Sequence, residues 1–158
     1  MTPILVVACG NPLRGDDGVA WEIARVLGDS RGVGEGRCEV VAVHQLMPEL
    51  AECVSEAEGV IFIDAAVSAQ PGEIRVRVID AAPLFVTEFS HSLGPAELLA
   101  IARDVFARVP RRAFLVTVSA GAFEFSETLS DAVRGAIPGA VEEIGALCRD
   151  ALLTHISR

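Results

Sequence analysis

No apolar run in this 158-residue chain approaches the ~18 residues needed to cross a bilayer, and Met1-Thr2-Pro3 lacks the basic start of a secretory signal. Basic residues are also scarce, with 13 Lys plus Arg against 22 Asp plus Glu and a net charge of -9. An acidic surface repels phosphate backbones, which disfavours nucleic acid as a partner. We therefore expect a cytoplasmic protein with no membrane insertion and no nucleic-acid partner.

The four cysteines contain no Cys-x-x-Cys pair, so a metal–thiolate site is weakly supported and small buried residues are the simpler interpretation. Neither a G-x-G-x-x-G motif nor a Walker lysine is present. No repeat and no linker-like change of composition divides the chain. With 51% hydrophobic residues, the sequence predicts one α/β domain over residues 1–158.

Apolar patterning predicts the order βαβαββαβα. Residues 3–9 and 60–63 are continuously apolar, as expected for buried parallel strands, whereas residues 74–79 alternate, as in a half-exposed strand. The short link before residues 74–79 predicts a hairpin, and hence an antiparallel edge strand. The fold class is therefore a three-layer α/β structure: a five-stranded, mostly parallel twisted sheet with one antiparallel edge strand and helices on both faces.

A last helical region should follow Ser130, as its cap, and extend to about Leu153. Pro138 either kinks this region or begins a new helix.

The segment from Gly10 to Gly18, GNPLRGDDG, lies where the first strand passes into a helix. Ligands of open α/β sheets bind at this edge. Asp16 suits a helix cap, and Asp17 a first-turn acid favoured by the helix dipole. Either carboxylate also suits a metal ligand or a general base for water.

Two further residues should reach the same edge. Asp64 ends the strand 60–63, and a carboxylate after four apolar residues is costly to bury without a partner. His91 follows the loop 80–90, which can span roughly 35 Å. His44 and His155 lack such a setting and are expected at the surface. Two carboxylates and one imidazole would leave coordination positions open on nickel, zinc or manganese.

These elements together resemble the nickel–iron hydrogenase maturation peptidases. The resemblance rests on the loop 10–18, on Asp64-Ala65 followed by Pro71-Gly72, and on His91 before a Leu-rich helix. It implies an endopeptidase that removes the C-terminal extension of a hydrogenase large-subunit precursor once nickel has been inserted. Nickel would then be carried by the precursor, with no tightly bound cofactor expected. Asp17, Asp64 and His91 would be both the metal-contacting and the catalytic residues.

The sequence departs from the family pattern after the fifth predicted strand, residues 114–118. Members carry a polar residue followed by Pro there, and later a Gly before Leu-Ser, whereas this chain has the stretches SAGAFE at 119–124 and ETLS at 127–130. We expect this region to shape the cleft for the precursor.

Two alternatives use the same residues. The first is a non-enzymatic metal-binding or chaperone module for a metalloenzyme precursor. The second is a nucleotide-binding domain that uses the loop after the first strand, which the acidic run disfavours. No Ser-His-Asp or Cys-His arrangement stands out, so a covalent nucleophile is less favoured than an activated water.

Overall fold

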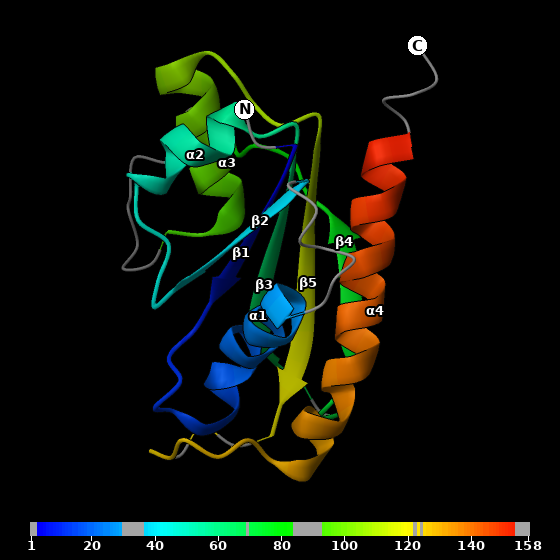
Figure 1. Ribbon diagram of the computed structural model, residues 1–158. Helices are drawn as coiled ribbons and strands as arrows, with labels where there is room; N and C mark the ends of the chain where they lie inside the picture. Colours follow the sequence, from blue (N-terminus) through cyan, green and yellow to red (C-terminus); the bar gives the residue numbers. More distant parts are fainter. Residues whose placement is uncertain are drawn as a thin grey trace.

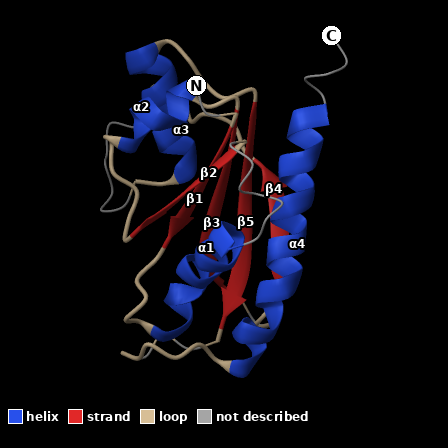
Figure 2. Ribbon diagram, in the orientation of Figure 1, coloured by secondary structure: helices blue, strands red, loops and turns tan. Residues whose placement is uncertain are grey.

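The computed structural model describes residues 3–29, 37–68, 70–83, 93–121, 123 and 125–153. Within these ranges five strands form one sheet, and helices pack against both of its faces (Figures 1 and 2). The strands are β1 (Ile4–Cys9), β2 (Cys38–Val43), β3 (Gly59–Val67), β4 (Ile74–Val78) and β5 (Arg112–Ala120). The helices are α1 (Val19–Asp29), α2 (Leu50–Glu56), α3 (Pro95–Phe106) and α4 (Asp131–Leu153).

The strand order is β2-β1-β3-β5-β4, and only the β4–β5 pair is antiparallel. The predicted mostly parallel sheet with an antiparallel edge strand is confirmed. The predicted hairpin is wrong, because β5 lies between β3 and β4, so β4 pairs with β5 instead of its sequence neighbour. Alternating polarity marks β4 as an edge strand but says nothing about which strand it adjoins.

The core has two layers, one on each face of the sheet. Alternate residues of the buried strands face opposite sides. Val6, Ile61 and Ile63 pack with α1 and α4 in one cluster. Leu5, Val7 and Phe62 pack with α2 and α3 in the other. The predicted arrangement of helices on both faces is confirmed.

Helix boundaries differ from the prediction at two places. The segment before α1 is a short 3₁₀ helix, Gly15–Gly18, and no side chain caps its start. The predicted capping role of Asp16 is therefore wrong. At the other end of the chain, α4 runs without a break through Pro138, so no new helix begins there.

No helix in these described ranges is both long enough and apolar enough to cross a membrane.

Candidate active site at the carboxyl edge of the sheet

The loop after β1 folds tightly back on itself and positions Asp17. The Asn11 side chain accepts a hydrogen bond from the Leu13 amide at 3.0 Å, and the Asn11 backbone amide donates to Asp17 Oδ2 at 2.8 Å. Gly10 is required by a close contact, because a Cβ at that position would lie 2.1 Å from the Asp17 carbonyl oxygen. The loop thus holds one oxygen of the half-buried Asp17 carboxylate in place.

Asp64 reaches the same region from the neighbouring strand. Ala8 of β1 is level with Ile63 of β3, so Cys9 and Asp64 are the next residues along the two strands. Asp64 alternates with Ile63 and therefore points to the face covered by α2 and α3. Its Oδ1 accepts a hydrogen bond from the Ala65 amide at 2.8 Å.

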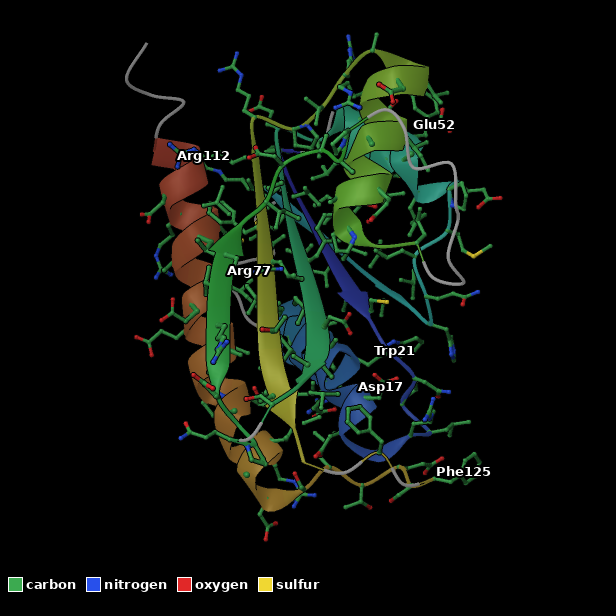
Figure 3. All side chains as sticks on the ribbon, turned by 180° about the vertical axis from the view of Figure 1, so that it is seen from behind. Asp17, Trp21, Glu52, Arg77, Arg112 and Phe125 are labelled. Atoms are coloured by element: carbon green, nitrogen blue, oxygen red, sulfur yellow. The ribbon has the colours of Figure 1, made fainter. Side chains whose placement is uncertain are left out.

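Burial raises the pKa of Asp64 to about 6, against the lowering effect of the Ala65 hydrogen bond. The negative charge of Asp17 raises this pKa further, which shows that the two carboxylates lie within electrostatic range of each other. Figure 3 shows Asp17 at this end of the molecule, next to the carboxyl ends of the central strands. Two acids brought together in this way favour a bound cation or a shared proton.

Cys9 lies beside the two acids, which the sequence did not indicate. Burial raises the pKa of its thiol to about 11, with further contributions from Asp64 and Asp17. At neutral pH Cys9 is therefore a thiol and a poor nucleophile. Of the other three cysteines only Cys148 is fully buried, while Cys53 is exposed, so the interpretation of all four as buried residues is only partly correct.

Asp16 lies next to Asp17 in the chain but has a different role. Its carboxylate is fully buried and accepts hydrogen bonds from the Gly121 amide at 2.8 Å and from the Ser130 amide and hydroxyl at 2.7 and 2.8 Å. Asp16 joins the loop after β1 to the segment between β5 and α4. A carboxylate enclosed in this way cannot contact a substrate, so Asp17 is the better candidate for a general base.

The segment after β5, where the sequence departs from the family pattern, lies against the loop after β1. The Ser126 amide donates to the Leu13 carbonyl at 2.9 Å, and the Gly15 amide donates to the Ser126 carbonyl at 2.7 Å. Glu127 to Leu129 line a cleft of about 610 Å³ together with Pro12 and Gly18. This segment therefore lines a cleft beside the motif, and its use by a precursor stays a prediction.

His91 and His155 lie outside the described residues. The described chain resumes at Leu93, which packs against the cluster on the α2 and α3 side of the sheet. This is the face to which Asp64 points. His44 is exposed as expected, and its ring contacts Trp21 edge to face at 5.0 Å. No group of three or more His, Cys, Asp or Glu side chains suited to a metal ion occurs within the described ranges.

The chain matches a known protein family. Residues 41–146 match the HycI family, described as hydrogenase maturation protease. No curated protein sequence matches the chain. The solved structure of the hydrogenase maturating endopeptidase HybD from E. coli is similar, with a TM-score of 0.77 and 26% identity over 95% of this chain and 94% of that one.

Two solved structures from Thermococcus kodakarensis share the fold. The [NiFe] hydrogenase maturation protease HybD has a TM-score of 0.67 and 23% identity, over 93% of this chain and 99% of that one. The maturation protease HycI has a TM-score of 0.70 and 20% identity, over 94% and 93%. The family match covers more than half of the chain, and the resemblance seen in its motifs is confirmed. The chain belongs to the hydrogenase maturation protease family.

Proposed function

We propose that this protein is the endopeptidase that removes the C-terminal extension from the nickel-loaded large-subunit precursor of a hydrogenase. Family membership supports the endopeptidase role over a non-enzymatic chaperone and over a nucleotide-binding domain. The observation that carries the proposal is the approach of Asp17 to Asp64 at the carboxyl edge of the sheet, where the charge of one raises the pKa of the other.

In this proposal nickel is part of the substrate. Two neighbouring carboxylates repel each other, and a divalent cation brought in by the precursor relieves that repulsion. His91 supplies the third contact to the nickel from the chain that precedes α3. The three side chains together bind the nickel, and the scissile peptide bond is thereby aligned at the edge of the sheet. Positioning of this kind lowers a reaction barrier by several kcal/mol.

The attacking group in the proposed reaction is water. Asp17 is half-buried, and within the described part of the chain only its Oδ2 accepts a hydrogen bond, from the Asn11 amide, so it can act as a general base. The proton that Asp17 takes from the attacking water goes on to the leaving amine, while Asp64 stays deprotonated as a ligand of the precursor's nickel. A water polarised by the nickel of the precursor is the competing route. The protonated thiol of Cys9 disfavours a covalent intermediate at that residue.

Mass spectrometry of the products tests the proposal. The protein is incubated with a hydrogenase large-subunit precursor in nickel-loaded and nickel-free forms. We expect one short C-terminal peptide from the loaded precursor and none from the nickel-free form. Binding without release of a peptide would identify a chaperone instead. Equal cleavage of both forms would show that the protein is an endopeptidase that does not recognise nickel.

A further inference from the structure

A second cleft, of about 800 Å³, lies at the end of the sheet opposite the acidic pair. It is formed where α3 ends, β5 begins and β4 ends, which is the amino edge of the parallel strands. Figure 3 shows Arg112 at this end of the molecule and Asp17 towards the other. The cleft is therefore separate from the proposed active site, and its volume is within the usual range for a ligand site.

The walls of this cleft are basic although the chain carries a net charge of -9. Arg103, Arg111 and Arg112 line it, and Asp80 is the one acid among the described residues of the lining. Arg103 is fixed by hydrogen bonds to Asp104 and to the Ala82 carbonyl. Across the described parts of the chain, neither Arg111 nor Arg112 forms a salt bridge, and both are exposed. Two arginines are thus available to an anionic ligand.

The same cleft has an apolar side. Val78 and Val109 line it and are 73% and 45% exposed, and Leu99 lies buried at its base. Val105 and Phe106, near the end of α3, add further exposed apolar surface close by. Apolar patches of this kind, edged by arginine, are typical of surfaces that bind other proteins.

We propose that this cleft binds an acidic peptide segment of a partner protein, with at least one apolar side chain in the segment. The guanidinium groups of Arg111 and Arg112 bind carboxylates, for which their planar fork is suited. Val78 and Val109 contact the apolar side chain. A nucleic acid is a poorer match, because the overall negative charge of the protein and the carboxylate of Asp80 both repel a continuous phosphate backbone.

Fluorescence anisotropy with a labelled peptide that alternates Glu and Leu tests this proposal without any cleavage reaction. We expect the peptide to bind the intact protein, and to bind more weakly as salt is added. Arg111→Gln/Arg112→Gln should weaken binding by about tenfold or more, since it removes two charge-assisted hydrogen-bonding groups. Arg37→Gln/Arg75→Gln removes two exposed charges outside both clefts and should change the affinity by no more than about twofold.

Two further measurements test the apolar side of the cleft and the chemical class of the ligand. Val78→Ser/Val109→Ser should also weaken binding, and the matching Gln–Leu peptide should bind far less well than the Glu–Leu peptide. The proposal is overturned if the Glu–Leu peptide fails to bind, if the Arg111/Arg112 variant binds it as the unmodified protein does, or if a single-stranded oligonucleotide of equal length binds more tightly. Circular dichroism of each variant verifies that it is folded.

Discussion

Asp16 and Ser130, which are 114 residues apart, are joined by two hydrogen bonds: the Ser130 amide donates to Asp16 Oδ1 at 2.7 Å and its hydroxyl donates to Oδ2 at 2.8 Å. The Gly121 amide donates to Oδ2 as well. The buried carboxylate is thus one connection between the loop that carries Asp17 and the segment that leads into α4, beside the backbone hydrogen bonds of Ser126. Its function is to hold these two segments together.

Asp16→Asn should lower the free energy of unfolding by about 2–4 kcal/mol, because an amide nitrogen would replace one acceptor oxygen and face an N–H donor in a buried place. Ser130→Ala removes only the hydroxyl and should cost about 1–2 kcal/mol. Urea unfolding measures both changes. Asp29→Asn, at an exposed acid at the end of α1, is the control and should change stability by under about 0.5 kcal/mol. An Asp16→Asn variant with the same free energy of unfolding as the unmodified protein would contradict the anchoring role.

Gly10→Ala should reduce both stability and peptidase activity. The added Cβ would lie 2.1 Å from the Asp17 carbonyl oxygen, so the loop must move and the Asp17 carboxylate must move with it. We expect a loss of about 2–4 kcal/mol in unfolding free energy. Gly28→Ala is the matched control: no atom lies within 4 Å of its added Cβ, and it should stabilise α1 by about 0.5–1 kcal/mol. Normal activity in Gly10→Ala would show that the close contact is dispensable.

Asp64→Asn should become more stable relative to the unmodified protein as the pH rises. The folded protein keeps a proton on Asp64 up to about pH 6, whereas the unfolded chain releases it near pH 3.8. Stability therefore falls as the pH rises from about 4 to 6, and this loss is absent from the amide variant. The difference between the two proteins should grow by about 1–3 kcal/mol between pH 4 and pH 7.

Urea unfolding at several pH values measures this difference, and Asp104→Asn provides the contrast. A hydrogen bond from Arg103 lowers the pKa of Asp104, so its removal should lower stability at neutral pH and matter less in acid. If the difference in unfolding free energy between Asp64→Asn and the unmodified protein stays constant from pH 4 to pH 7, the pKa of Asp64 is not raised.

The affinity for free Ni²⁺, weak as we expect it to be, should fall as the pH drops below about 6. Metal ligands must be deprotonated, and both Asp64 and an ordinary imidazole, with a pKa near ~6.5, take up protons in this range. Calorimetry should show an affinity lower by about tenfold or more at pH 5 than at pH 8. His91→Gln should weaken binding at pH 8 and reduce the pH dependence. Equal affinity of the unmodified protein at both pH values would contradict His91 as a ligand.

The sequence predicted the sheet well because its buried strands are continuously apolar and its edge strand alternates. Asp17 and Asp64 could be proposed as neighbours because the carboxyl ends of β1 and β3 meet at one edge of the sheet. The pairing of β4 with β5 could not be predicted. Alternating polarity identifies β4 as an edge strand but does not indicate which strand it pairs with. The partners of Asp16 were equally hidden, because a local helix cap and a contact with Ser130 leave the same local pattern in the sequence.

Cys9 illustrates the same limit in the site itself. Its place beside Asp64 follows from the register between β1 and β3, which the sequence does not specify. The motif residues, by contrast, were identifiable because GNPLRGDDG combines tight-turn residues with two acids at the end of a strand. Local chemistry was therefore predictable, whereas contacts between distant segments required the fold.

The decisive measurement of the role of Asp17 is the rate at which Asp17→Ala releases the C-terminal peptide from nickel-loaded precursor. We expect a rate lower by about 10²-fold or more, because the variant loses both a contact to the substrate nickel and the proposed base for water. Asp29→Ala should retain the normal rate, and circular dichroism should show both variants folded. An Asp17→Ala variant that processes the precursor as fast as the unmodified protein would show that Asp17 neither binds the nickel nor activates the water.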